Sequence, residues 1–325
     1  MITHWDDAPT LRRETGGFVA GTWTLLGEHS VSIGLRRIRI DPGRFSTPAH
    51  VHGAEEELHY ILGGHGLSWQ AGETYEVAAG DLLVHLGGAE PHTLHAGEDG
   101  LDVLAFGQRV RDEALVLPRA GVLWAQRPGH WVELAGGPTP WEREAAAGPP
   151  ELPPPSLRPS RIANLRDCPP REVAHGDSQL VVRDLGRAAG SRTTGLRHQV
   201  VAPGKLGWPP HCHSAEEELL VVLEGEGELL LGDERRDVEI GGGRRRPAGV
   251  ERIPVRRGHV VARPPATRVP HAFRAGPGGL TYLAYGTRDP NDIGYYPRSQ
   301  KVYLRGIGVM ARLDQLEYWD GEPDA

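Results

Sequence analysis

His50-Val-His-Gly-Ala-Glu-Glu-Glu57 recurs 161 positions later as His211-Cys-His-Ser-Ala-Glu-Glu-Glu218, and a Pro-His pair follows each copy. Alternate side chains of a strand point to the same face, so the two histidines of each His-x-His run lie together. A tight turn then brings the last glutamate beside them, and a later strand brings the histidine of the Pro-His pair. Three imidazoles and one carboxylate suit a divalent transition metal. The sequence therefore predicts one metal site in each half, with the ligands His50, His52, Glu57 and His92 in the first and His211, His213, Glu218 and His271 in the second.

The duplication extends well beyond these motifs. Gly34-Leu-Arg36 matches Gly195-Leu-Arg197 at the same offset of 161, and Leu104-Ala-Phe-Gly107 matches Leu283-Ala-Tyr-Gly286 at an offset of 179. A period this long indicates two duplicated domains rather than a solenoid of short repeats. The change of offset means that the second half carries about 18 extra residues between its two metal motifs.

A proline-rich stretch separates the two halves. Proline cannot donate to a sheet ladder and favours extended, semi-rigid chain, so this stretch is expected to be a linker. We predict an N-terminal domain over residues 1–135, a linker over 136–160 and a C-terminal domain over 161–325.

Short apolar runs, such as Leu58–Leu62 and Leu219–Leu223, are separated by glycine, proline and aspartate. This punctuation is typical of strand boundaries, and no window shows a long, capped helical period. Many short strands joined by such turns predict an all-β class, with a sandwich or barrel in each half.

The composition is that of an ordinary soluble protein. Hydrophobic residues make up 38% of the chain, the net charge is −7, and no run approaches the roughly 20 apolar residues of a membrane span. The N-terminus lacks the basic start and apolar core of a signal peptide. We therefore expect a cytoplasmic protein that binds neither membranes nor nucleic acid, and with only Cys168 and Cys212 we expect no disulfide framework.

The extra segment of the second half, residues 232–257, holds eight arginines against five acidic residues. A solvated surface loop, a lid over the second site for an anionic substrate, and a nucleic-acid contact are the three interpretations of this segment.

The two motifs resemble those of the cupin superfamily, and the chain as a whole resembles a bicupin. The first cupin motif fits both halves, except that six residues rather than five separate Gly43 from His50 and Gly204 from His211. The second motif fits less closely, since Leu86 stands where proline is usual. The resemblance implies two tandem double-stranded β-helix (jelly-roll) barrels, each with a metal ion in its mouth.

The resemblance leaves the reaction open. The leading hypothesis is a metal-dependent dioxygenase or related oxidoreductase that acts on a small organic molecule, similar to the bicupins that cleave flavonols. The alternatives are an isomerase or epimerase of a sugar or sugar phosphate, a decarboxylase of a small diacid, and a non-catalytic small-molecule-binding protein. We expect one divalent metal per domain, with iron or manganese ahead of zinc, nickel, cobalt and copper. A homodimer is expected by analogy alone.

His59 is the candidate catalytic acid–base residue. It lies two residues beyond Glu57 and therefore shares the inward face of the same strand. Its counterpart in the second half is Leu220, so the two sites are expected to differ in role. The simpler interpretation of His59 is a hydrogen-bonded interior histidine, and His65, His85, His95 and His259 are expected to be ordinary polar residues.

Overall fold

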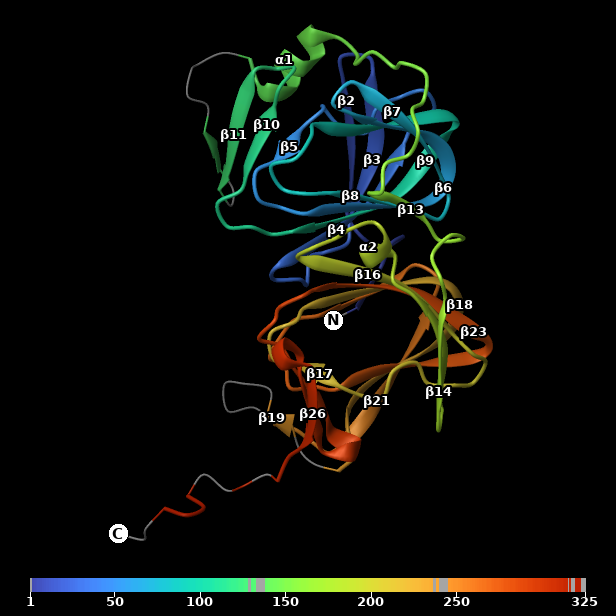
Figure 1. Cartoon of the computed structure of the whole chain (residues 1–325), viewed down its shortest axis with the longest axis vertical. Coiled ribbons are helices and arrows are strands. Elements are labelled where there is room, and N and C mark those ends of the chain that lie inside the picture. The colour runs from blue at the N-terminus through green and yellow to red at the C-terminus, as the bar shows by residue number, and fades with distance from the viewer. Residues whose placement is uncertain are drawn as a thin grey trace.

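The structure is a computed structural model that describes residues 2–127, 130–132, 138–235, 238–239, 245–314, 316 and 319–322. Two β-rich bodies are stacked along the long axis of the molecule, the first coloured blue to green and the second yellow to red (Figure 1). Each contains an eight-stranded sheet and a four-stranded sheet that together form a barrel. The predicted all-β class, with one barrel in each half, is confirmed.

The N-terminal barrel has a large sheet of order β13-β8-β6-β9-β4-β3-β2, with β7 paired to β6, and a small sheet of order β12-β11-β10-β5. The strands are β2 (Thr10–Thr15), β3 (Val19–Leu25), β4 (Ile33–Ile40), β5 (Val51–His52), β6 (Glu57–Gln70), β7 (Glu73–Ala78), β8 (Asp81–His85), β9 (His92–Gln108), β10 (Ala114–Leu117), β11 (Val122–Arg127), β12 (His130–Val132) and β13 (Ile162–Asn164).

The C-terminal barrel repeats this plan, with a large sheet of order β1-β22-β18-β23-β16-β15-β14, β21 paired to β18, and a small sheet of order β17-β24-β25-β26. The strands are β1 (Ile2–His4), β14 (Arg171–His175), β15 (Ser178–Arg183), β16 (Thr194–Val201), β17 (Cys212–His213), β18 (Glu218–Asp233), β21 (Gly249–Arg256), β22 (His259–Arg263), β23 (His271–Thr287), β24 (Ile293–Tyr296), β25 (Lys301–Leu304) and β26 (Val309–Arg312), with the small hairpin of β19 (Val238–Glu239) and β20 (Arg245–Arg246). Short helical turns are α2 (Leu185–Ala188), η1 (Pro297–Ser299) and η2 (Arg305–Ile307).

The two barrels exchange edge strands. β1, from the start of the chain, pairs with β22 of the C-terminal barrel, and β13, from the second half, pairs with β8 of the N-terminal barrel. Each exchanged strand covers an edge that would otherwise present unpaired backbone groups. The sheets of the two barrels therefore do not follow the predicted boundaries 1–135 and 161–325. The sequence did not indicate this exchange, because the pairing of a strand at a sheet edge leaves no local signal in the sequence.

The segment predicted as a linker packs against the N-terminal barrel. Helix α1 (Pro140–Ala147) begins within it, with a capping box between Thr139 and Glu142 that satisfies free backbone amides at the helix start. Beyond the helix, the Trp69 indole donates to the carbonyl of Glu151 at 3.0 Å. Residues 138–160 thus form a helix and a packed strap instead of a plain extended connection.

The extra residues of the second half lie in the hairpin between β18 and β21. The corresponding hairpin of the first half turns at Ala71 and Gly72, whereas β18 runs on to Asp233 and β21 begins only at Gly249. Arg244 and the side chains of Arg245 and Arg246 lie outside the described residues, so the role of this arginine-rich segment stays a prediction.

The largest hydrophobic cluster lies between the two barrels rather than inside either one. Strand alternation places Leu58 and Tyr60 of β6 on this face, opposite Leu219 of β18 and its neighbours. At its centre the rings of Phe106 and Tyr285 lie 4.9 Å apart, and both residues are fully buried. Burial of so much apolar surface between the halves favours one rigid unit.

His198 on β16 makes stability depend on pH. Burial and the neighbouring Arg183 lower the pKa of His198 from 6.5 to about 4. Between these two pH values the imidazole is therefore protonated in the unfolded chain and neutral in the folded protein. Stability contributed by the neutral form is therefore lost as the pH falls from 6.5 toward 4. Between pH 7 and pH 5 we expect the metal-free protein to lose about 2 kcal/mol through this group. Urea unfolding of the wild type and His198→Gln at both pH values checks this, and an equal loss in the two proteins would refute it.

Candidate metal centres

The N-terminal centre forms where β5, β6 and β9 meet inside the barrel. The Glu57 Oε2 atom lies 3.0 Å from His92 Nε2, 3.6 Å from His52 Nε2 and 3.8 Å from His50 Nε2. An antiparallel bridge between His50 and His92 draws the loop before β5 onto β9. The four predicted ligands of the first half thus converge on one point, with donor atoms that all lie within 4.8 Å of one another.

Hydrogen bonds orient these imidazoles. His50 Nδ1 lies 2.9 Å from the carbonyl of Pro48, so Nδ1 carries the proton and Nε2 faces the centre with a free lone pair. His92 Nδ1 lies 3.4 Å from the carbonyl of Glu90. His52 Nε2 is buried and has no hydrogen-bond partner within the described chain, as expected of an atom that binds a metal ion.

The ionisation states of His92 and Glu57 also suit metal binding, whereas that of His52 does not. Burial lowers the pKa of His92 to about 3, so its imidazole is neutral at physiological pH. Burial alone would raise the pKa of Glu57, but the surrounding His59, His50 and His52 hold it well below its usual value, so the carboxylate is ionised. In His52, burial is outweighed by the carboxylates of Glu113 and Glu57, which raise the pKa to about 10. A metal ion must therefore displace a proton from this residue.

The C-terminal centre repeats the arrangement on β17, β18 and β23. Glu218 Oε2 lies 2.9 Å from His271 Nε2 and 3.6 Å from His213 Nε2, and the rings of His211 and His271 are 4.7 Å apart. Burial lowers the pKa of His271 to about 3, so it too is neutral. The donor atoms of His211, Glu218 and His271 thus lie within 4.8 Å of one another. His213 lies beside Glu218 but groups with Glu216 and Asp292, so the second set of predicted ligands is drawn together less completely than the first.

A carboxylate that the sequence prediction missed supports each His-x-His loop. Glu113 accepts the backbone amides of Gly53 at 2.6 Å and Glu55 at 3.1 Å, and its Oε1 lies 3.6 Å from His52 Nδ1. Asp292 accepts the amide of Glu216 at 3.0 Å and lies 2.7 Å from His213 Nδ1. The signal was available, because Glu113 and Asp292 correspond at the offset of 179.

His59 and His85 add two imidazoles to the N-terminal centre alone. His59 Nε2 lies 3.3 Å from Glu57 Oε2, as the inward face of β6 requires. His85, expected to be an ordinary polar residue, instead stacks on the predicted ligand His92 with ring centroids 3.7 Å apart, and neither of its ring nitrogens has a hydrogen-bond partner within the described chain. At the matching positions the C-terminal barrel has Leu220 and Arg263, so the two centres differ in their surroundings.

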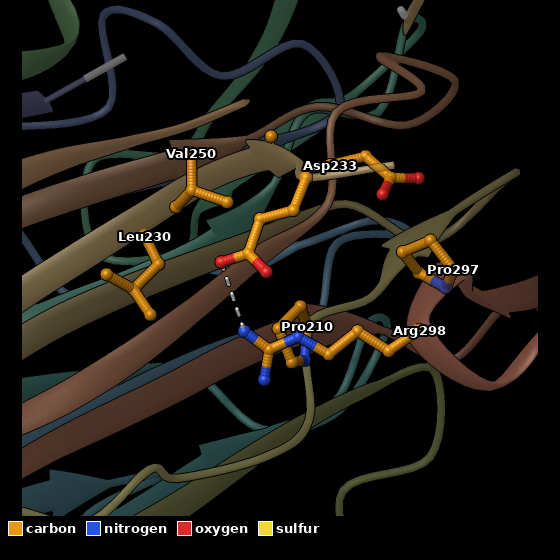
Figure 2. A pocket seen from close by; sticks show the side chains of 8 residues that line it. Pro210, Leu230, Asp233, Val250, Pro297 and Arg298 are labelled. Carbon is orange, nitrogen blue, oxygen red and sulfur yellow. Dashed lines mark ion pairs between the residues drawn. The ribbon is translucent and has the colours of Figure 1, made fainter. Parts of the chain in front are cut away.

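A small pocket lies next to the segment that leads into the C-terminal centre (Figure 2). Pro210, on one wall, precedes the ligand His211, and Tyr296, beside Pro297 on another wall, stacks on the His211 ring at 5.5 Å. Arg298 reaches across the pocket to within 3.9 Å of Glu234, the ion pair drawn in Figure 2.

In the N-terminal barrel the corresponding arginine contacts helix α1. Arg119, which corresponds to Arg298, pairs with the buried Glu144 of this helix at 3.0 Å. The two corresponding arginines thus each pair with a glutamate, although the two glutamates come from unrelated parts of the chain.

Comparisons with known proteins identify the class to which this architecture belongs. The cupin domain family matches residues 36–106 and 197–263, one match in each barrel. No curated protein sequence matches the chain. Each half is therefore a cupin domain, and the chain is a bicupin of the cupin superfamily.

Several solved structures share the two-barrel fold. A serine-to-alanine mutant of Bacillus subtilis oxalate decarboxylase OxdC is 15% identical, with a TM-score of 0.60, over 91% of this chain and 79% of that one. The formate complex of Lactobacillus farciminis oxalate decarboxylase is 14% identical, with a TM-score of 0.57, over 90% of this chain and 87% of that one. These similarities confirm two tandem jelly-roll barrels.

None of the helices in the described part of the chain combines the length and the apolar composition that crossing a membrane requires. The cytoplasmic location, the absence of nucleic-acid binding and the homodimer stay predictions.

Proposed function

We propose that this bicupin is a metal-dependent enzyme that acts on a small organic acid, with decarboxylation of a small diacid as its reaction. The observation that carries the proposal is the convergence of three imidazole Nε2 atoms on one carboxylate oxygen, Glu57 Oε2, inside the barrel. Three nitrogen ligands and one oxygen ligand suit a divalent transition metal and leave coordination positions for a substrate. Around Glu218 the nitrogens of His271 and His213 lie at 2.9 and 3.6 Å, and His211 completes a group with Glu218 and His271.

Manganese is the metal we propose first, ahead of iron. The sequence did not favour either manganese or iron as the bound metal. One structure of similar fold, of Bacillus subtilis oxalate decarboxylase, is described by its Mn(II) centres, and this supports manganese. When bound, the metal would polarise the carboxylate oxygens of a substrate as a Lewis acid. His50, His52, Glu57 and His92 would hold it in the N-terminal barrel, and His211, His213, Glu218 and His271 in the C-terminal barrel.

Decarboxylation fits the surroundings of the N-terminal centre. The reaction breaks one carbon–carbon bond, releases CO2 and adds one proton to the carbon that remains, without consuming an external oxidant. The proton needs a donor at the centre, and His59, 3.3 Å from Glu57, is placed to hold it. The similar fold of two oxalate decarboxylases supports this reaction ahead of the dioxygenase reaction predicted from the sequence.

Turnover of oxalate and malonate separates these reactions. With Mn(II)-loaded protein we expect one CO2 for each diacid consumed and no net oxygen uptake, followed by NMR of carbon-13-labelled substrate and an oxygen electrode. Oxygen consumption in step with product would favour the dioxygenase, which rests on the same ligand set. Failure to convert either diacid would contradict the proposed decarboxylase.

Replacing His59 by leucine is expected to lower turnover by about 100-fold or more, because a positioned proton donor contributes a factor of this order. Leucine already occupies the matching position 220 of the other barrel, so the fold should tolerate it. Metal content, measured in parallel, should stay unchanged. His65→Leu on the exposed part of the same strand is the matched control. Wild-type turnover in His59→Leu would show that His59 is only an interior histidine.

Removing the supporting carboxylates should weaken metal binding. Glu113→Gln and Asp292→Asn leave the ligands in place but remove the charge beside His52 Nδ1 and His213 Nδ1. We expect the Mn(II) affinity of the corresponding centre to fall by about 10-fold or more, as measured by calorimetry. Asp177→Asn, in an exposed ion pair with Arg274, is the control. An unchanged affinity in both variants would mean that these carboxylates only support the loops.

A further inference from the structure

The residue before each glutamate ligand reaches into the opposite domain. Glu56, only 2% exposed, accepts hydrogen bonds from five donors of residues 191–194, which form the end of the loop before β16 and the first residue of that strand. The hydroxyls of Ser191 and Thr194 donate at 2.6 and 2.5 Å, and the backbone amides of Arg192, Thr193 and Thr194 donate at 2.7, 3.2 and 3.1 Å. A buried carboxylate with this many donors is firmly held.

Glu217 makes the reciprocal connection from the C-terminal domain. It is fully buried and accepts the amides of Val31 and Ser32 at 2.7 and 2.6 Å and the Ser32 hydroxyl at 2.6 Å. These donors precede β4 as Ser191 and its neighbours precede β16, at the offset of 161. The two connections are therefore related by the internal duplication.

Each contacted loop is also held from its own side. Arg288 donates to the carbonyl of Ser191 at 2.9 Å, and Arg109 donates to the carbonyls of Ser30 and Gly27. An arginine of the same domain thus binds the carbonyls of the loop while a glutamate of the opposite domain binds its amides. The loop is a fixed surface against which the glutamate can be positioned.

Strand geometry links these contacts to the ligands. Glu56 and Glu57 are adjacent, so their side chains point to opposite sides, one into the other domain and one into its own barrel. The amide of Glu56 donates to Gln108 at 3.2 Å, and the amide of Glu217 donates to Thr287 at 3.1 Å. The backbone that carries Glu57 is thus held on one side by Gln108 of its own domain and on the other by the bonds that the Glu56 carboxylate accepts from the opposite domain, so loss of the latter removes one of its two supports.

We propose that Glu56 and Glu217 are positioning residues through which each domain completes the metal centre of the other. The inference rests on the metal binding proposed above. It predicts a crossed dependence: residues 191–194 of the C-terminal half set the affinity of the N-terminal centre, and Ser32 of the N-terminal half sets the affinity of the C-terminal centre.

The test uses the full chain in two backgrounds that each keep one centre. His211→Ala with His271→Ala leaves the N-terminal centre, and His50→Ala with His92→Ala leaves the C-terminal centre. Ser191→Ala with Thr194→Val should weaken Mn(II) binding about 10-fold in the first background and leave the second unchanged. Ser32→Ala should do the reverse, with a smaller, about threefold loss because one donor of three is removed.

Two control variants distinguish an effect on the position of the metal ligands from a general destabilisation of the protein. Ser30 is the buried counterpart of Ser191, but the Ser30 hydroxyl has no hydrogen-bond partner within the described chain. Ser30→Ala should therefore leave the Mn(II) affinity of both centres unchanged. Ser191→Thr with Thr194→Ser keeps both hydroxyls and should restore affinity. The Mn(II) electron paramagnetic resonance spectrum should change only in the crossed combinations, and circular dichroism verifies folding.

The outcomes distinguish the inference from the function on which it rests. Absence of Mn(II) binding in both backgrounds would overturn the proposed metal centres themselves. Binding that no loop substitution changes, or that every loop substitution weakens equally at both centres, would overturn the positioning role and leave the metal centres standing.

Discussion

Replacing His92 by alanine is expected to lower the Mn(II) affinity of the N-terminal centre by more than about 100-fold. This loss is larger than that expected for Glu113, which contacts a ligand but not the metal. Of the three predicted histidine ligands, His92 has the ring nitrogen closest to Glu57 Oε2, at 3.0 Å, and its ring is almost completely buried, so its removal takes a nitrogen donor from the middle of the centre. Calorimetric titration of the metal-free protein should show one lost binding event while the C-terminal centre still binds.

His95→Ala provides the matched control. His95 lies on the same strand, β9, but its ring packs against Phe45 with centroids 4.7 Å apart, outside the centre. Two intact binding events in His92→Ala would mean that the convergence around Glu57 does not bind metal.

Phe106→Ala is expected to destabilise the protein by about 3–5 kcal/mol, the usual cost of truncating a buried phenylalanine. The ring lies between the barrels against Tyr285, so its loss leaves a cavity bordered by both domains. Because the two halves share this core, urea unfolding should stay a single transition that moves to lower urea concentration.

Leu25→Ala, at a position 41% exposed, should change stability by less than about 0.5 kcal/mol and serves as the control. Two separate transitions in Phe106→Ala, one unchanged from the wild type, would show that the barrels unfold independently and that the shared core contributes little.

The clustering of the predicted ligands could be foreseen because strand alternation and the internal repeat are both local signals. His50 and His52 share a face wherever that run is extended, and the second copy made an accidental match improbable. The same reasoning placed His59 beside Glu57. Here the backbone period alone fixes the geometry.

His85 could not be placed in the same way. It reaches His92 because β8 pairs with β6 in a register that sets Glu57 opposite His85, and this register depends on the turn at Gly80 and not on the residues near His85. Glu113 and Asp292 were missed for a different reason. Carboxylates in loops are common, and only their shared offset distinguishes these two.

The organisation between the domains was the least predictable part. Glu56 and Glu217 stand in runs of three glutamates that normally form a solvated turn, and their burial depends on loops about 135 and 185 residues away. The exchange of β1 and β13 could not be predicted for a similar reason, because each short strand could pair with the sheet edge of either barrel. In the linker, the Thr139–Glu142 capping box was a readable signal, but the surrounding prolines outweighed it.

The metal content of the wild-type protein, purified without a metal-affinity tag, decides whether the two clusters bind metal ions. Elemental analysis should find about two equivalents of a divalent transition metal per chain, manganese or iron, one for each set of three histidines and one glutamate. Metal-free protein that takes up no Mn(II), Fe(II) or other divalent transition metal on reconstitution would contradict the proposed metal centres. The buried imidazoles and carboxylates would then have only a structural role in the two barrels.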